Sequence, residues 1–170
     1  MNYKRLFIPN SLIFITVVTN NRKNILTENI QYLRKAFEIT KTKYEFEIIA
    51  IIVNKDHFHM IIKPDNINIY PKIIGHIKST FTKISKLNHS LNNKRESNIW
   101  QRRYWEHTIT DEKDLNKHLD YIHYNLMKHY NIAPKNWEYS SFQKFVKNGF
   151  YDLDWCNFHN IHKINELNYE

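Results

Sequence analysis

Residues 45–63 read EFEIIAIIVNKDHFHMIIK and predict the centre of a β-sheet. The run 45–53 is almost wholly apolar from residue 48 onward, which is typical of a strand that is buried on both faces. The polar residues 54–56 predict a turn, because Asn and Asp favour tight reversals of the chain. Residues 57–63 are therefore expected to form a second strand that pairs with the first as a hairpin.

A strand and a helix are predicted on each side of this hairpin. Residues 12–19 are rich in β-branched and aromatic side chains and predict a strand, and a helical pattern opens at Thr27 and runs towards Lys43. After the hairpin, apolar residues recur at helical spacing at Ile74, Ile77, Phe81 and Ile84. Residues 99–110 then read as an extended segment. The order β-α-β-β-α-β predicts an α+β, ferredoxin-like fold with an antiparallel sheet and both helices on one face. In such a fold the other face can stay open.

A third helix is expected to start at Asp111 and to stop before Pro134. Its apolar stripe consists of Leu115, Leu119, Ile122 and Leu126. We expect residues 1–134 to form the core. Residues 135–170 are aromatic and basic and predict a C-terminal extension packed on or beside that core, with a short helical stretch near 140–147.

The composition excludes several classes of protein. The chain has one cysteine, Cys156, and two glycines in 170 residues. It therefore has neither a disulfide framework nor a cysteine-based zinc cluster, and no glycine-rich loop for a nucleotide cofactor. The longest apolar run is too short to span a membrane, and the first residues lack the pattern of a signal peptide. A cytoplasmic protein without membrane association is expected.

The charge favours a polyanionic partner. Lys and Arg exceed Asp and Glu by 25 − 17 = 8, and aromatic residues make up 15% of the chain. Cations can pair with phosphates and exposed rings can stack on unpaired bases. Within 100–107, at most half of the side chains can face one way. Other lysines of the second helix predict a solvated face. The candidates for contact with DNA are Arg102, Arg103, Tyr104, Trp105 and Lys78.

His57 and His59 form the sharpest chemical pattern in the chain. Side chains two residues apart on a strand point to the same face. Phe58, Met60 and Ile62 should then face the helices, so the two imidazoles lie on the opposite side of the sheet. Two converging imidazoles are a good start for a divalent metal site. The alternative is a pair of surface histidines on a half-exposed strand.

The third helix offers partners for these histidines. Tyr121 and Asn125 are four residues apart, on one side of the helix, where the apolar stripe should meet solvent. An amide oxygen such as that of Asn125 can bind a hard cation. Either His118 or His129 could instead be the third ligand. Tyr124 points away from the stripe and is expected to be exposed.

Four segments together resemble a known family. They are DHFHMI (56–61), WQRRYWEH (100–107), DYIHYN (120–125) and WEYSSF (137–142). In content and order the sequence resembles the REP-associated tyrosine transposases, which belong to the single-tyrosine HUH transposases of bacterial insertion sequences.

The resemblance implies a ferredoxin-like core and a DNA-cleaving enzyme. The implied reaction is metal-dependent cleavage and strand transfer of single-stranded DNA, with hairpin or palindromic ends, through a 5′-phosphotyrosine intermediate. It implies that Tyr121 is the nucleophile and that His57, His59 and Asn125 bind Mg²⁺ or Mn²⁺, without a nucleotide cofactor. It also implies a bacterial, nucleoid-associated protein that acts as a monomer or as a homodimer with exchanged helices.

The sequence departs from the family pattern in three places. Leu126 stands where the family has proline, and Tyr130 where it has glycine. The N-terminal Gly-Arg-Glu-Tyr element that some members use to hold DNA hairpins has no clear match.

Two other functions compete with this interpretation. They are a non-catalytic nucleic-acid-binding module of the same fold and a metal-dependent nuclease that uses activated water. A structural zinc site is a weaker alternative, because cysteine ligands are absent.

Overall fold

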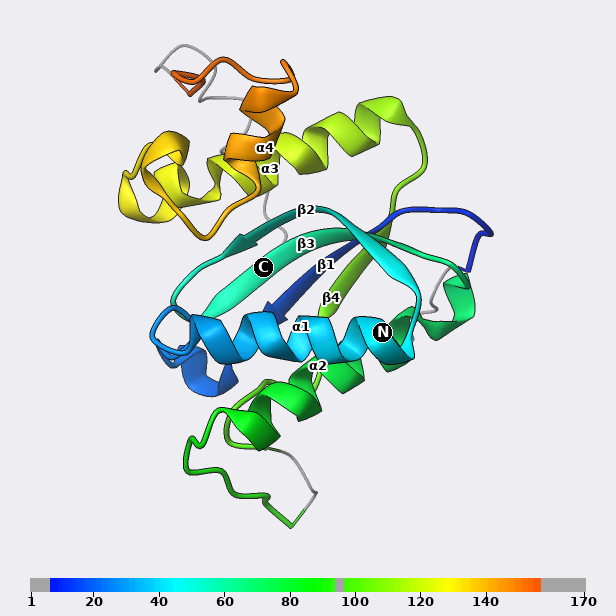
Figure 1. The fold of residues 1–170 in the computed structure, drawn as a ribbon, viewed down its shortest axis with the longest axis vertical. Helices are drawn as coiled ribbons and strands as arrows, with labels where there is room; N and C mark the ends of the chain where they lie inside the picture. The colour runs from blue at the N-terminus through cyan, green and yellow to red at the C-terminus, as the bar shows by residue number, and fades with distance from the viewer. Residues whose placement is uncertain (1–6, 94–96, 157–170) are drawn as a thin grey trace.

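The computed structural model describes residues 7–93 and 97–156, and its elements follow the predicted order (Figure 1). They are β1 (Ile13–Val18), α1 (Ile30–Lys43), β2 (Phe46–Val53), β3 (His57–Pro64), α2 (Tyr70–Ile84), β4 (Trp105–Thr108), α3 (Glu112–Tyr130) and α4 (Phe142–Lys147). Short 3₁₀ turns lie at Asn20–Arg22, Ile67–Ile69 and Pro134–Asn136. Among the described residues, no helix is both long enough and apolar enough to cross a membrane.

The four strands form one antiparallel sheet in the order β2-β3-β1-β4. The two strands of each β-α-β unit are therefore not neighbours. β3 lies between β1 and β2, and β1 lies between β3 and β4, as in the ferredoxin-like motif. The β2–β3 hairpin closes where the Asn54 amide donates to the His57 carbonyl at 2.8 Å. The predicted fold class is confirmed.

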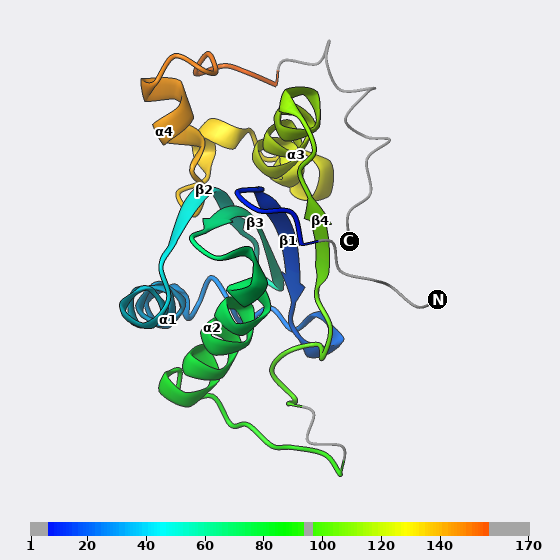
Figure 2. The same cartoon turned by 90° about the vertical axis from the view of Figure 1, so that its right-hand side faces the viewer.

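Helices α1 and α2 cover one face of the sheet, as predicted (Figure 2). Alternate residues of β3, namely Phe58, Met60 and Ile62, are fully buried there. The helices contribute Leu33, Ala36, Phe37, Ile73, Ile74, Ile77 and Phe81 to the same cluster. The hydrophobic effect thus fixes which side of each strand faces these helices, because a shift of one residue would turn the apolar set outward.

The second face of the sheet, which such a fold can leave open, is covered by α3 (Figure 2). The strands carry a second apolar set on that side, composed of Phe14, Ala50, Ile52 and Ile61. The α3 stripe of Leu119, Ile122 and Leu126 packs against it, with Leu115 partly buried beside them. A strand that is apolar on both faces is stable only if both faces are covered. The apolar run of β2, which predicted a central strand, is therefore also the reason why α3 packs on the second face.

The ends of several elements differ from the predicted ones. Helix α1 begins at Ile30 rather than Thr27, and only Trp105–Thr108 of the segment 99–110 is a strand. Helix α3 begins after Asp111, whose carboxylate accepts a hydrogen bond from the Asp114 amide and caps the helix. Leucine at position 126 lets α3 continue to Tyr130.

The segment that follows α3 joins the sheet to the back of that helix. Its backbone bridges the edge strand β2, where the Val53 amide donates to the Tyr139 carbonyl at 2.8 Å. The Ser141 hydroxyl lies 3.1 Å from the Ile51 carbonyl oxygen and 2.9 Å from His123 Nε2 on α3. A division of the chain at residue 134 stays a prediction, and residues 157–170 of the predicted extension lie outside the described residues.

His123 makes the stability of the fold dependent on pH. Its side chain is fully covered, and burial lowers its pKa from 6.5 to about 3. The unfolded chain therefore binds a proton that the folded chain excludes, and stability falls as the pH drops from about 6.5 towards 3. We expect the free energy of unfolding of His123→Gln to fall less steeply with decreasing pH than that of the wild type, by about 1.4 kcal/mol per pH unit. The measurement is urea unfolding of both proteins at pH 7, 6, 5 and 4.

The matched control is His89→Gln, since His89 is exposed in a loop. This variant should follow the wild-type pH dependence. Equal slopes for His123→Gln and the wild type would contradict the prediction.

Candidate active site

His57 and His59 occupy the start of β3, directly after the hairpin turn, and point to the face that α3 covers. In the sheet register, His59 lies opposite Thr16 and His57 opposite Val18. The two imidazole rings are 4.9 Å apart, centre to centre. His57 is 2% exposed and His59 is fully buried. The predicted shared face is present, but it is an interior face rather than a half-exposed surface.

The Nδ1 atoms of both histidines are held by neighbouring side chains. His57 Nδ1 lies 2.6 Å from Asp56 Oδ1, and His59 Nδ1 lies 2.8 Å from the Thr16 hydroxyl oxygen. The Asp56 carboxylate can only accept, which places a proton on His57 Nδ1. The Asn125 Nδ2 amide donates to His59 Nε2, which places the His59 ring proton on Nδ1. Asp56 is itself held by Arg22 at 3.1 Å. The Nε2 lone pairs are therefore left on the side that faces α3.

Two amide side chains meet these lone pairs. Asn125 Nδ2, from α3, lies 3.1 Å from His59 Nε2, and Asn54 Nδ2 lies 2.8 Å from His57 Nε2. Asn54 Nδ2 also donates to Asn125 Oδ1, so that hydrogen bonds link four buried side chains from His59 through Asn125 and Asn54 to His57. Asn54 Oδ1 is buried and accepts no hydrogen bond from the described residues. One buried acceptor of the site thus has no donor among the described residues.

The electrostatic environment keeps His59 neutral. Burial lowers its pKa well below the usual value of 6.5, and the positive potential of nearby His57, His129, Lys128 and Arg22 lowers it further. Burial alone would raise the pKa of Asp56, but hydrogen bonds and charge interactions with His57 and Arg22 lower it overall. A neutral imidazole that is oriented by a carboxylate or hydroxyl is the form that binds metal ions.

Tyr121 lies beside the histidines and beneath the surface. Its ring centre is 5.1 Å from that of His59, and it is 1% exposed. Lys128 Nζ lies 5.4 Å from the centre of the Tyr121 ring. The predicted position at the boundary between core and solvent is therefore wrong for both Tyr121 and Asn125.

Tyr124 is also buried, at 3% exposure, although its direction on the helix predicted an exposed residue. Every residue from 121 to 126 is buried. The helix has the sheet on one side, and the segment that carries Ser141 packs on His123 at another. A prediction from one apolar stripe assumes that a helix has a single buried side, and α3 has more than one.

The other candidate ligands occupy different places. His129 is exposed at the end of α3, and its ring centre is 5.8 Å from that of His57. His118 is buried but contacts Asp114 and stacks on His107. Of the three residues considered as a third ligand, Asn125 is the one that contacts His59.

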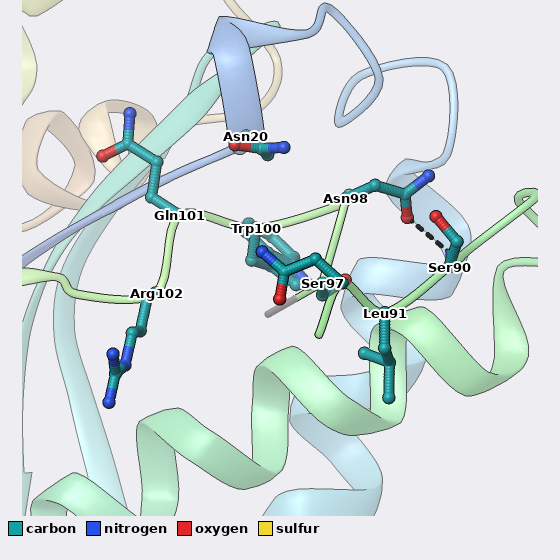
Figure 3. Close-up of a pocket in the computed structure, with 9 residues that line it drawn as sticks. Asn20, Ser90, Leu91, Ser97, Asn98, Trp100, Gln101 and Arg102 are labelled. Atoms are coloured by element: carbon teal, nitrogen blue, oxygen red, sulfur yellow. Dashed lines mark hydrogen bonds between the residues drawn. The ribbon is translucent and has the colours of Figure 1, made fainter. Parts of the chain in front are cut away.

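Of the basic candidates for DNA contact, the two arginines are exposed and the lysine is hydrogen-bonded to the backbone. Arg102 and Arg103 are exposed in the segment that leads into β4. Lys78 Nζ donates to the Gln101 carbonyl at 2.8 Å and to the Arg102 carbonyl at 3.2 Å, and burial lowers its pKa to about 8. Figure 3 shows Gln101 and Arg102 on the wall of a cavity of about 370 Å³. Lys78 therefore anchors the segment that presents the arginines.

The two aromatic candidates point to opposite faces of the sheet. Tyr104 packs against the α1–α2 cluster, while Trp105 packs on the α3 side, edge-on to Phe14 at 5.6 Å. Both are half-buried. This follows the alternation of side chains along an extended chain.

Four residues of the site were missed in the sequence: Thr16, Arg22, Asn54 and Asp56. Asn54 and Asp56 stand in the turn before the histidines, and a polar pair at that position was the available signal. Thr16 lies 43 positions from His59, and only strand register brings the two together.

Comparisons with known proteins agree on one family. Residues 9–125 match the family described as "Transposase IS200 like". This range includes the candidate ligands His57, His59 and Asn125 and the candidate nucleophile Tyr121. A Haemophilus influenzae protein assigned as a REP-associated tyrosine transposase is 43% identical over 162 residues, covering 91% of this chain and 92% of that protein. The REP-associated tyrosine transposase of Escherichia coli is 36% identical over 157 residues, covering 91% and 90%. A solved REP-associated tyrosine transposase bound to a REP hairpin has a TM-score of 0.80 and 34% identity, over 92% of each chain.

Proposed function

Since this chain belongs to the IS200-like family of tyrosine transposases, which are DNA endonucleases, we propose that it cuts and rejoins single-stranded DNA through a covalent bond between Tyr121 and a 5′-phosphate. The observation that carries the proposal is the position of Tyr121. Its ring lies 5.1 Å from that of His59, and Asn125, which contacts His59, follows one helical turn later. A phenol beside a set of metal-binding groups is the arrangement that this chemistry requires.

The donor set fits a divalent metal ion. His59 Nε2 meets the amide of Asn125, His57 Nε2 meets that of Asn54, and these two amides are hydrogen-bonded to each other. Each imidazole is oriented through Nδ1 by a second side chain. The surplus buried acceptor on Asn54 is a further sign that the site suits a cation. His57, His59 and Asn125 would hold the ion. Mg²⁺ or Mn²⁺ bound there would withdraw electron density from a scissile phosphate.

The residues of this chain then carry the transfer. The Tyr121 phenol oxygen attacks phosphorus and forms the P–O bond of a 5′-phosphotyrosine, while the bond to the 3′-oxygen breaks. The phenol loses its proton, and the leaving oxygen gains one to become a 3′-hydroxyl. The ester bond is conserved, so attack by another 3′-hydroxyl reverses the step and joins two strands without a nucleotide cofactor. Tyr121 must become exposed for this reaction, because its side chain is covered in the structure described here.

The DNA partner is proposed to be a hairpin flanked by a single strand. A relative that is 34% identical and shares the fold was solved with a REP hairpin. Arg102 and Arg103 supply exposed cations for phosphate groups near β4, and the chain carries a net charge of +8.

Two other functions remain distinct in their products. A metal-dependent nuclease with activated water would use the same histidines and release free DNA ends. A binding module would retain DNA and cut nothing. A covalent protein–DNA adduct separates the proposed reaction from both.

Tyr121→Phe should abolish the covalent adduct and leave DNA affinity within about twofold, because it removes only the attacking oxygen. The measurement is a denaturing gel after incubation with labelled hairpin DNA and Mn²⁺, alongside a binding titration with Ca²⁺. Tyr124→Phe is the matched control, since this buried tyrosine lies on the same helix, and its adduct should persist. An adduct formed by the Tyr121→Phe protein would exclude this nucleophile.

Asn125→Ala should lower the rate of adduct formation by at least about 10-fold at low Mn²⁺, because it removes the proposed amide ligand. Asn125→Asp keeps an oxygen ligand and should recover much of the rate as Mn²⁺ is raised. The rate is measured as a function of Mn²⁺ concentration, and EDTA should reduce it to background. If Asn125→Ala had the wild-type metal dependence, Asn125 would not be a ligand.

Replacing both Arg102 and Arg103 with Ala should weaken DNA binding similarly for all sequences. Each lost phosphate contact should reduce the slope of log K against log salt by about 0.7–0.9. Affinity is measured from 50 to 300 mM NaCl. Lys83→Ala, an exposed lysine on α2, is the control and should leave the slope unchanged; an unchanged slope in the double variant would place the DNA elsewhere.

A further inference from the structure

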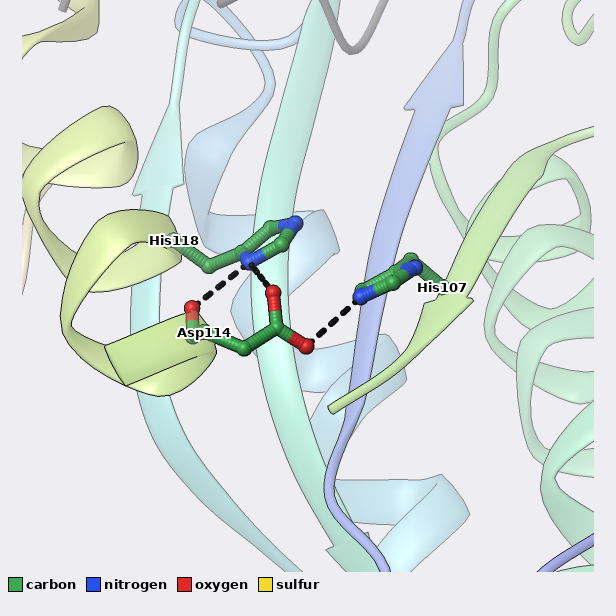
Figure 4. Close-up of side chains that lie close together, drawn as sticks. All are labelled: His107, Asp114 and His118. Atoms are coloured by element: carbon green, nitrogen blue, oxygen red, sulfur yellow. Dashed lines mark hydrogen bonds and ion pairs between the residues drawn. The ribbon is translucent and has the colours of Figure 1, made fainter. Parts of the chain in front are cut away.

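A second group of metal-binding side chains lies outside the candidate active site. His107 on β4 and Asp114 and His118 on α3 point toward one another (Figure 4). His107 Nε2 is 2.8 Å from Asp114 Oδ2, and His118 Nδ1 is 3.1 Å from Asp114 Oδ1. One donor atom from each residue lies within 4.8 Å of the other two. The two imidazole rings are stacked, with centres 4.7 Å apart and planes 13° from parallel.

The cluster and the active site are separated by an aromatic side chain. The Phe14 ring lies 4.7 Å from that of His118 on one side and 5.7 Å from that of His59 on the other. The cluster joins the edge strand to the first turns of α3, whereas His57 and His59 lie on the inner strand β3. The two groups share no residue.

From this geometry we infer a second metal site, in which His107, Asp114 and His118 bind one Zn²⁺ ion per chain. Two imidazole nitrogens and one carboxylate oxygen form a donor set that zinc accepts. Bond lengths of about 2.0–2.1 Å in a tetrahedral site place ligand atoms roughly 3.3 Å apart. The distances of 2.8 and 3.1 Å between the present donor atoms would lengthen slightly. His118 Nδ1 would give up its 2.8 Å contact with the Asp114 carbonyl oxygen, and the stacked rings would turn so that both nitrogens face one ion.

The surroundings of Asp114 support this assignment. The Thr110 amide and hydroxyl both donate to Asp114 Oδ2, at 3.0 and 3.3 Å, and orient the carboxylate as the outer partners of metal ligands do. Asp111 and Glu112 add negative charge near the same turn. His118 is 1% exposed, whereas the side chain of His107 is 36% exposed and gives an ion access from solvent.

An ion at this position would join β4 to α3, the helix that carries Tyr121 and Asn125. Three protein ligands leave one position for water or for an oxygen of bound DNA. The site would thus stabilise the orientation of the catalytic helix without taking part in the chemical step.

The test counts zinc ions on the full-length chain. The wild type should bind about two Zn²⁺ per chain in equilibrium dialysis with elemental analysis, and the His57→Gln/His59→Gln protein about one. Adding Asp114→Asn or His107→Gln to that background should remove the remaining ion. His89→Gln, an exposed histidine outside both sites, is the control and should leave the count unchanged.

Thermal unfolding supplies a second readout. In the His57→Gln/His59→Gln background, Zn²⁺ at about 100-fold excess over its Kd should raise Tm by about 5–10 °C, and the His107→Gln addition should abolish the shift. Because His107 is partly exposed, that variant tests the site even if Asp114→Asn fails to fold. A count of zero in the His57→Gln/His59→Gln protein, or one ion that persists after His107→Gln, would overturn the inference.

Discussion

The register between β1 and β3 is the constraint on which the candidate site depends. It places Thr16 opposite His59, so that the hydroxyl holds Nδ1 and directs Nε2 towards α3. Asp56 does the same for His57 from the turn. A slip of one residue would turn both imidazoles into the α1–α2 core and turn Phe58 out of it. The apolar packing of one face therefore fixes the chemistry of the other.

Helix α3 connects the site to the rest of the molecule. Its apolar stripe binds it to the sheet, and Asn125 and Tyr121 reach the histidines from its flank. At its start, Asp114 contacts a histidine of β4. On a further side, His123 contacts Ser141, which in turn hydrogen-bonds to β2. The position of Tyr121, the proposed nucleophile, is thus determined by packing at both edges of the sheet.

The burial of Tyr121 has a direct consequence for the proposed reaction. A nucleophile that is 1% exposed is protected from solvent and also from DNA, so cleavage requires a local movement of its side chain or of α3. Binding of the correct DNA could supply the energy for that movement, which would make exposure of the phenol part of substrate selection. In the proposed reaction Lys128, whose ammonium group lies over the Tyr121 ring, would meet a phosphate bound there.

The sequence by itself determined the element order, the hairpin and the shared direction of His57 and His59, because these follow from short-range periodicity and from alternation along a strand. The spacing of Tyr121 and Asn125 likewise placed both on one side of a helix. The burial of Tyr121, Tyr124 and Asn125 could not be predicted from this spacing. It depends on segments distant in the chain that cover α3. The contacts of Thr16 with His59, of Arg22 with Asp56 and of Asn54 with Asn125 were also decided only by tertiary structure. Strand register and the docking of α3 bring these residues together, and both result from the packing of two apolar faces rather than from any local pattern.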